Sequence, residues 1–250
     1  MRIVSSIHPE QPRSGLDDAH PSLEVEWLGR MPYARALEVQ DAARARRARG
    51  ESGDRLLLLE HPPVVTLGRS HHDSNLLLDA EGYAERGIEV FEAARGGDVT
   101  YHAPGQLVGY LIVDLDARGE RDLHLHVRRI EGALMRALEG FGVPTKRIDG
   151  RSGVFVEKDV EKNDGDEIGG ADRKLASIGV GVKRWVTWHG FALNVTTDLA
   201  GFDVIVPCGL EDVEMTSVAR EAGLPVLGLD VRVREAVVEA FVAVFGGAAS

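Results

Sequence analysis

The sequence predicts an α+β fold in which helices flank one mixed β-sheet. Short apolar runs that are typical of buried strands outnumber the amphipathic helical segments, and the two kinds do not alternate regularly. A regular alternation of strand and helix would instead favour a doubly wound parallel sheet. The chain has 250 residues, of which 44% are hydrophobic, and shows no internal repeat. This is enough for one core, so we expect a single domain over residues 23–250.

Residues 1–22 carry charges and prolines without an apolar stretch, which predicts a poorly ordered tail and no secretory signal. No apolar run reaches the roughly 18 residues that span a bilayer, so we expect a cytoplasmic protein that does not bind membranes. The net charge of -11 argues against nucleic acid as a partner. The single cysteine excludes an intrachain disulfide and a multi-cysteine metal site.

The first half of the chain predicts three elements before its most unusual segment. Residues 23–28 form an apolar strand, and residues 32–49 form a helix with Pro32 at the first helical position. The leucine run at residues 56–59 is a short buried strand that ends at two prolines. The arginines at 44, 46, 47 and 49 are either a solvated face or a landing patch for an acidic partner protein.

The second half predicts further strands and two helices. Apolar residues at helical spacing predict a helix over residues 122–141, and a second amphipathic helix covers residues 231–245. Residues 158–172 are rich in Asp, Glu, Lys and Gly and have no period, so we expect an exposed insertion. The expected strands are residues 107–115, 154–157, 174–182 and 185–195, the last two adjacent to each other.

Residues 95–106, with the sequence RGGDVTYHAPGQ, are the most informative segment. Neighbouring glycines allow a backbone to approach a ligand closely, and a loop that leads into a buried strand is a common position for a site. The segment has neither the dinucleotide-binding nor the P-loop glycine pattern, and Pro104 and a strand follow it instead of a helix. It is therefore a tight turn between strands or a cradle for a ligand other than a nucleotide.

Cys208 is flanked by Pro207 and Gly209, which favours a turn that substrate can reach over a buried core position. A thiol needs a nearby cation or base to become a good nucleophile, because little of it is ionised at neutral pH. Lys174, which begins an apolar strand, is a candidate for that cation, although a lysine at a strand start is commonly only exposed. Proximity of Lys174 to Cys208 would decide between these interpretations.

The histidines do not indicate a metal site. The adjacent pair His71 and His72, and the pair His124 and His126, come without a third convergent ligand. We interpret His61 as structural. His102, inside the glycine segment, and His189, before Gly190, are better placed to orient a substrate by hydrogen bonds.

The chain contains four ordered blocks, at residues 95–106, 174–179, 188–195 and 207–209. Together they resemble the octanoyl-[acyl-carrier-protein]:protein octanoyltransferases, the lipoate–protein ligase B family. The resemblance covers residues 25–217, and four blocks in the right order are specific where any one alone is weak. One departure is Ala103, where the family has glycine; a backbone with negative φ would accept the methyl group.

The resemblance implies a fold shared with biotin–protein ligases and lipoate ligases, and octanoyl transfer without a cofactor as the first step of protein lipoylation. It implies an acyl-thioester on Cys208, with Lys174 lowering the pKa of that thiol. It implies that octanoyl-acyl carrier protein is the donor and that lipoyl domains of 2-oxoacid dehydrogenases and the glycine cleavage H protein are the acceptors of a monomeric enzyme. The implied acyl-chain contacts are Arg95, Gly96, Gly97, Asp98, Val99, Thr100, Tyr101, His102, Ser177, Ile178, Gly179, Gly190, Phe191 and Ala192.

Three alternatives stay open at this point. An ATP-dependent lipoate–protein ligase on the same fold would adenylate the free acid and would not need Cys208. A non-catalytic acyl- or lipoyl-binding module would bind without turnover. A thioesterase would form the adduct and release octanoate to water.

Overall fold

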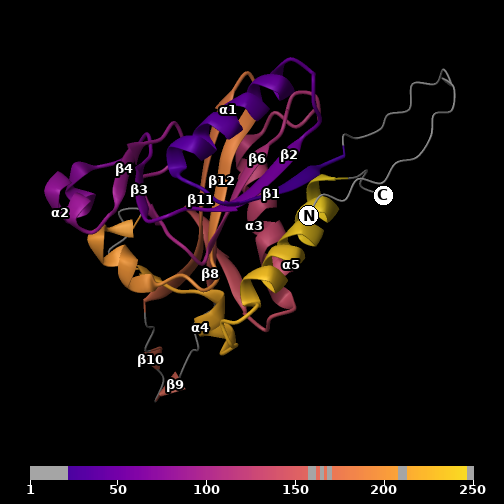
Figure 1. The fold of residues 1–250 in the computed structure, drawn as a ribbon. Helices are drawn as coiled ribbons and strands as arrows, with labels where there is room; N and C mark the ends of the chain where they lie inside the picture. The colour runs from indigo at the N-terminus through magenta and orange to yellow at the C-terminus, as the bar shows by residue number, and fades with distance from the viewer. Residues whose placement is uncertain (1–21, 157–161, 164–165, 168–170, 208–212, 247–250) are drawn as a thin grey trace, which may run out of the picture.

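A large mixed sheet forms the centre of the molecule (Figure 1). The structure is a computed structural model that describes residues 22–156, 162–163, 166–167, 171–207 and 213–246. The strand order is β1-β2-β6-β12-β11-β8-β7, and β13 pairs with β11 outside this path. The pairs β1/β2 and β11/β13 are parallel and the other pairs are antiparallel, which confirms the predicted α+β class with a mixed sheet. The strands are β1 (Glu24–Arg30), β2 (Arg55–Glu60), β6 (Gln106–Ile112), β7 (Thr145–Ile148), β8 (Arg151–Val156), β11 (Asp172–Lys183), β12 (Val186–Asn194) and β13 (Val213–Met215).

The central strands are buried on both faces because helices cover each side of the sheet. Every residue of β6 and of β12 is buried, as expected for strands that are covered on both faces. Helix α1 (Tyr33–Ala48) covers one face, and α3 (Leu123–Glu139) and α5 (Leu229–Phe245) pack together on the other (Figure 1). The two faces form separate apolar clusters, of which the one under α3 and α5 is larger.

The helix boundaries differ slightly from the prediction. Pro32 is the residue before α1, not its first residue, because its ψ of 146° is extended. The side chain of Asp122 caps α3 by accepting a hydrogen bond from Leu125 N–H at 3.0 Å. Helix α5 begins at Leu229, two residues before the predicted start, after Gly228 with a φ of 74°. The short helix α4 (Val218–Ala222) was not predicted; Ser217 caps it through a hydrogen bond from Arg220 N–H at 3.3 Å.

A second sheet of three strands, which the sequence did not predict, stands beside the first (Figure 1). Its order is β4-β3-β5, and the last strand occupies the middle of the segment that we expected to be a loop. The strands are only four residues long, and their buried apolar residues are divided between two small clusters, so no long apolar run in the sequence indicates them. The elements of this part are β3 (Val64–Leu67), β4 (Glu89–Glu92), β5 (Val99–His102), α2 (Ala80–Glu85) and the 3-10 helices η1 (Asp73–Asn75) and η2 (Leu199–Val204).

Other predictions fall partly outside the described residues. Within the expected insertion, the short strands β9 (Lys162–Asn163) and β10 (Asp166–Glu167) pair antiparallel, and Asp172 already belongs to β11. The predicted tail lies outside the described residues except for Ser22, and so does Glu157 at the end of the predicted strand 154–157. In the part of the chain that the structure describes, no helix is long and apolar enough to cross a membrane.

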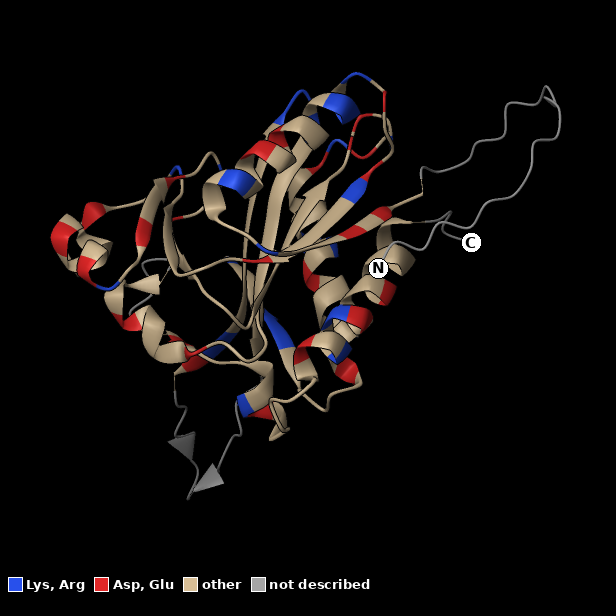
Figure 2. Cartoon of the chain, viewed as in Figure 1, with Lys and Arg blue, Asp and Glu red and all other residues tan. Residues whose placement is uncertain are grey.

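The arginines of α1 do not form the open basic patch that one interpretation proposed. Arg47 is buried and pairs with Asp54 at 2.7 Å and with Asp114 at 3.3 Å. Arg44 faces Asp41 at 3.4 Å and lies over the ring of Trp188, and Arg49 pairs with Glu51 at 2.6 Å. Figure 2 shows residues of both charge signs along this helix, and mainly acidic residues in α2 and β4. Carboxylates therefore pair with three of the four arginines, whereas the fourth, Arg46, is exposed and forms no ion pair among the described residues.

Candidate active site

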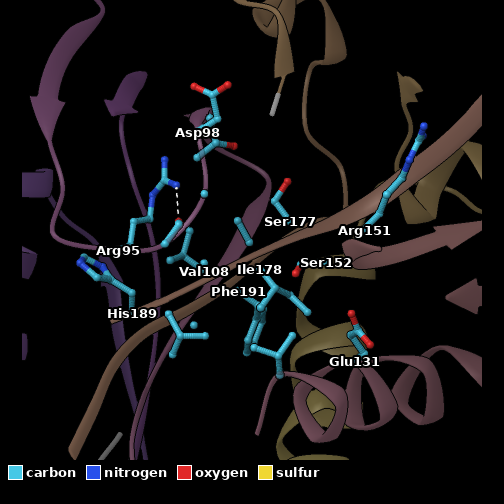
Figure 3. Close-up of a pocket in the computed structure, with 18 of the residues that line it drawn as sticks. Arg95, Asp98, Val108, Glu131, Arg151, Ser152, Ser177, Ile178, His189 and Phe191 are labelled. Atoms are coloured by element: carbon cyan, nitrogen blue, oxygen red, sulfur yellow. Dashed lines mark hydrogen bonds between the residues drawn. The ribbon is translucent and has the colours of Figure 1, made fainter. Parts of the chain in front are cut away.

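A cavity of about 530 Å³ lies where the two sheets meet, within the usual size range of small-molecule sites. Its walls come from the connection between β4 and β5, from strands β5, β6, β11 and β12, from α3 and the start of α1, and from the turn that leads into β8. Figure 3 shows Arg95, Asp98 and His189 on one side of the view and Glu131, Arg151 and Ser152 on the other. Twelve of the fourteen implied acyl-chain contacts line this cavity: Arg95, Gly96, Gly97, Asp98, Thr100, His102, Ser177, Ile178, Gly179, Gly190, Phe191 and Ala192.

Residues 95–98, which we call the strap, cross over β11 and hold the two sheets together. Gly96 N–H donates to Val180 O at 2.9 Å. The buried guanidinium of Arg95 donates through Nη2 to both Thr66 O at 2.7 Å and Thr66 Oγ1 at 2.8 Å. Arg95 therefore anchors the strap to β3 as well as facing the cavity.

Glycines make this crossing possible. A Cβ at Gly179 would lie 2.8 Å from Gly96 O, and a Cβ at Gly68 would lie 2.1 Å from Gly97 O. A real side chain does not tolerate such contacts, so both positions require glycine while the strap stays where it is. These glycines thus allow the backbones of the strap and of its neighbours to pack closely, and this packing forms the cavity wall.

The direction of side chains in strand β5 explains why Val99 and Tyr101, two of the implied acyl-chain contacts, do not line the cavity. Successive side chains of a strand point to opposite faces. Thr100 and His102 face the cavity, whereas Val99 and Tyr101 pack into the small cluster, where Tyr101 meets Phe202 edge to face. Ala103 follows with a negative φ and a buried methyl group, so the departure from glycine is accommodated.

Lys174 lies in the cavity wall with 3% of its surface exposed. Its Nζ lies 5.6 Å from the centre of the Phe155 ring, and its stem passes over Gly153, where a Cβ would be 2.8 Å from Lys174 Cε. The common expectation that a lysine at a strand start is exposed is wrong here, because β8 and β13 flank β11 on both sides at this residue.

Strand β12 contributes a strained residue to the wall. His189 has a φ of 57°, a left-handed value that non-glycine residues rarely adopt, and its N–H donates to Gln40 Oε1 at 2.7 Å. The buried amide of Gln40 thus supports this conformation. The ring of Phe191 also lines the cavity; it fits because Gly109 on β6 has no Cβ, which would otherwise lie 2.2 Å from that ring.

The buried histidines at the site are neutral at physiological pH. Burial, with a smaller contribution from Arg95 and Arg69, lowers the pKa of His189 to about 3. Burial, reinforced by His61, holds the pKa of His102 well below its ordinary value. His61 is structural as expected, since its ring contacts Met31 O and Tyr110 Oη, each at 2.9 Å. Neutral imidazoles suit hydrogen bonding to substrate better than charge pairing.

The proposed nucleophile Cys208 lies outside the described residues. The described residues before and after Cys208 are hydrogen-bonded, directly or through Asn75, to elements of the cavity wall. Before it, Val206 N–H donates to Asn75 O at 2.9 Å, and the Asn75 side chain donates to Asp98 Oδ2 at 2.5 Å in the strap. After it, β13 pairs with β11 so that Met215 is opposite Lys174.

The sequence did not predict the wall of the cavity that lies opposite the strap. It consists of α3 and the turn before β8, and includes the buried carboxylate of Glu131, which accepts from Gly153 N–H, Arg128 and Arg147. His124, considered only as a metal ligand, also lines it. The available signal was the single acidic residue within the apolar stripe of the predicted helix. The lining residues on this side are Leu123, His124, Val127, Arg128, Glu131, Gly150, Arg151 and Ser152.

Comparison with known proteins gives a consistent picture. The model of the lipoyl protein ligase A/B catalytic domain family matches residues 32–245. The octanoyltransferase of Acidobacterium capsulatum is 48% identical over 207 residues, which is 80% of each chain. The octanoyltransferase of Geobacter metallireducens is 48% identical over 208 residues, 83% of this chain and 87% of its own.

Two solved structures share the fold at low sequence identity. A bipartite lipoate protein ligase from Thermoplasma acidophilum superposes with a TM-score of 0.66 at 16% identity, over 90% of this chain and 84% of that one. A lipoate-protein ligase A bound with ATP gives 0.62 at 18% identity, over 90% and 85% of the two chains. Since the family model spans most of the chain and relatives are nearly half identical to it, the chain belongs to the lipoyl protein ligase A/B catalytic domain family, among its octanoyltransferases.

Proposed function

We propose that this enzyme moves an octanoyl group from acyl carrier protein to a lysine of a lipoyl domain, through a thioester on Cys208 with Lys174 as its proton partner. The observation that carries the proposal is the burial of Lys174 in the wall of the cavity that the motif residues build. A buried ammonium is costly unless an anion or polar groups accompany it. A thiolate that reacts with acyl groups is such an anion.

The described flanks of Cys208 support this pairing. The chain that follows Cys208 returns as β13 beside Lys174, and Thr216 N–H donates to Lys174 O at 3.0 Å. The chain that precedes Cys208 is tied through Asn75 to Asp98 in the cavity wall. Both connections favour a position of the thiol at this cavity.

In the first half-reaction the thiolate of Cys208 attacks the thioester carbonyl of the donor. A Cys208–acyl bond forms, the bond to the donor sulfur breaks, and the departing pantetheine thiolate takes a proton from the Lys174 ammonium. The ammonium also lowers the pKa of the Cys208 thiol beforehand, because an opposite charge favours the thiolate.

In the second half-reaction a neutral lysine amine of the acceptor attacks the Cys208 thioester. The amide bond forms, the excess proton of the amine passes to neutral Lys174, and Cys208 leaves as thiolate. The ion pair is restored and no proton is gained or lost over the cycle at the enzyme. Exchange between thioesters is nearly balanced in free energy and the step to an amide is downhill, so ATP is not required.

The cavity suits a hydrocarbon chain. Val108, Ile178, Phe191 and Ala192 provide apolar surface, and the glycines of the strap and of β11 expose backbone without side chains. Burying an eight-carbon chain contributes on the order of 5 kcal/mol at about 0.8 kcal/mol per methylene. The depth of the cavity would then select the length of the chain. We propose the lipoyl domains of 2-oxoacid dehydrogenases and the glycine cleavage H protein as acceptors.

A transfer assay with purified octanoyl-acyl carrier protein and a lipoyl domain tests the proposal. We expect octanoyl-lysine to form without ATP, and Cys208→Ala to lower the rate by at least about a hundredfold, since the covalent path is lost. Transfer at the wild-type rate by Cys208→Ala would contradict the mechanism.

The same assay separates the alternatives. Strict dependence on ATP with free octanoate would identify a ligase that adenylates its substrate. Binding of the lipoyl domain without turnover would identify a binding module, and release of octanoate to water in place of transfer would identify a thioesterase.

A further inference from the structure

A chain of buried amides connects the cavity wall to the strand that carries Lys174. His102 Nδ1 lies 2.7 Å from Gln106 Oε1, and Gln106 Nε2 donates to Asn194 Oδ1 at 2.8 Å. Asn194 Nδ2 then donates to Thr216 O at 2.9 Å, and Thr216 N–H donates to Lys174 O at 3.0 Å. Gln106, Asn194 and Thr216 are each at most 1% exposed, so water does not compete for these bonds.

The direction of this chain is fixed by two backbone carbonyls, which can only accept. Thr216 O requires the Nδ2 group of Asn194 to face it, which turns Asn194 Oδ1 toward Gln106. Gln106 must then present Nε2 to Asn194, and Tyr101 O at 3.2 Å demands the same orientation. The remaining atom, Gln106 Oε1, faces His102 Nδ1, so that nitrogen carries the proton.

A neutral imidazole with its proton on Nδ1 has a lone pair on Nε2. Burial keeps His102 neutral, as described above, and the rings of Tyr33 and His61 pack against it with centroids 6.3 and 5.7 Å away. His102 therefore presents a hydrogen-bond acceptor while it lines the cavity.

We propose that His102 accepts a hydrogen bond from an N–H group of the substrate, and that Gln106 and Asn194 are positioning residues that set its tautomer. This inference rests on the proposed function. An alkyl chain and a thioester carbonyl have no N–H to offer. The two substrate groups that do are an amide of the donor's pantetheine arm and the attacking amine of the acceptor lysine.

The tautomer is measured directly by NMR of the enzyme labelled with ¹⁵N-histidine near neutral pH. We expect His102 to show a protonated Nδ1 and a bare Nε2. Gln106→Met, which keeps the size of the side chain and removes the acceptor, should let the Nε2–H form appear. Thr216→Val is the matched control, because it removes a buried hydroxyl at the end of the chain of amides but keeps both backbone bonds; it should retain the Nδ1–H form.

The rates of the two half-reactions distinguish the two N–H sources. Gln106→Met should slow one of them about tenfold, as expected for one lost hydrogen bond. Slower acylation of Cys208 identifies the pantetheine amide, and slower transfer to the lipoyl domain identifies the attacking amine. If folded Gln106→Met changes neither rate, the substrate bond does not exist.

A protonated Nε2 with a bare Nδ1 in the wild-type protein overturns the proposal whatever reaction the protein catalyses. The expected tautomer in a protein that transfers no octanoyl group would instead count against the proposed function. Thermal unfolding of each variant shows whether it is folded; if Gln106→Met does not fold, Gln106→Glu replaces it. There a carboxylate on Nδ1 should raise the pKa of His102 in the NMR titration, and an unchanged pKa overturns the proposal.

Discussion

Gly179 shows how a single missing Cβ shapes the site. It lies on β11 beneath the strap, and a methyl group there would be 2.8 Å from Gly96 O and 3.1 Å from Arg95 Cδ. Gly96, in the strap itself, has a hypothetical Cβ at an ordinary 3.4 Å from Val180 O. Both glycines lie where the strap passes over β11, but only Gly96 has room for a Cβ.

Gly179→Ala should therefore destabilise the protein by about 1–3 kcal/mol, the usual cost of overpacking, and raise the KM for the octanoyl donor as the strap shifts. Gly96→Ala should cost less than about 1 kcal/mol. Denaturant unfolding and steady-state kinetics measure both effects. Equal stability of the two variants would show that the strap yields freely and that Gly179 is not required for packing.

His126 is a second residue whose environment has a measurable consequence. It is buried on α3 with its ring edge to face against Phe245, and burial lowers its pKa from 6.5 to about 4. Its two ring nitrogens have no hydrogen-bond partner among the described residues. Because the unfolded chain binds the proton more readily, the group favours unfolding as pH falls through the window from 6.5 to about 4.

His126→Leu should remove this dependence and flatten the loss of stability across that window. The group is expected to cost the wild-type protein about 3 kcal/mol at pH 4 relative to pH 7. Unfolding free energies measured at several pH values test this. An equal slope for wild type and variant would contradict the assigned pKa.

At the scale of elements, β11 contributes Lys174 to the cavity wall, and its predicted bounds of 174–182 differ by two residues at the start and one at the end. Its run of apolar and small residues signals a buried strand, and its hairpin partner β12 follows directly. The small sheet was missed because β3, β4 and β5 are four residues each, and β4 is mostly exposed while the apolar residues of β3 and β5 pack in small clusters. Local pattern does not reveal such a sheet, since its strands become buried only through long-range pairing.

A substitution at Lys174 tests whether this lysine of β11 lowers the pKa of the Cys208 thiol. Lys174→Met keeps most of the side-chain volume and removes the charge, so the pKa of the Cys208 thiol should rise, and the pH profile of its alkylation should move to higher pH. Lys146→Met is the control, because Lys146 contacts β11 through Asp172 at 3.2 Å but does not line the cavity. An unmoved profile in Lys174→Met would remove Lys174 from its assigned role.

At the scale of the whole molecule, the sequence was informative about the site wherever several motif blocks had to converge. The motif blocks predicted that the strap, β11 and β12 lie at one site. They did not show that Val99 and Tyr101 point away from the cavity, because that follows from β5 being a strand. It also missed the α3 side of the cavity, since Glu131 and His124 come together with Lys174 only in the folded chain.

We expect the net charge of -11 to repel an acidic protein partner. The arginines of α1 are largely paired with carboxylates, so the long-range field stays repulsive. We expect kcat/KM for octanoyl-acyl carrier protein to rise as salt is added, because salt screens repulsion. A neutral octanoyl-pantetheine thioester serves as control and should show little change. A fall with salt for the protein donor would reveal a local basic docking surface.

The most direct test of the central claim is mass spectrometry of the enzyme after mixing with octanoyl-acyl carrier protein alone. We expect a gain of one octanoyl group, on the peptide that contains Cys208, and its loss when a lipoyl domain is added, with octanoyl-lysine as the product. An enzyme that stays unmodified while transfer proceeds, or an octanoyl group on any other residue, would contradict the proposed thioester mechanism.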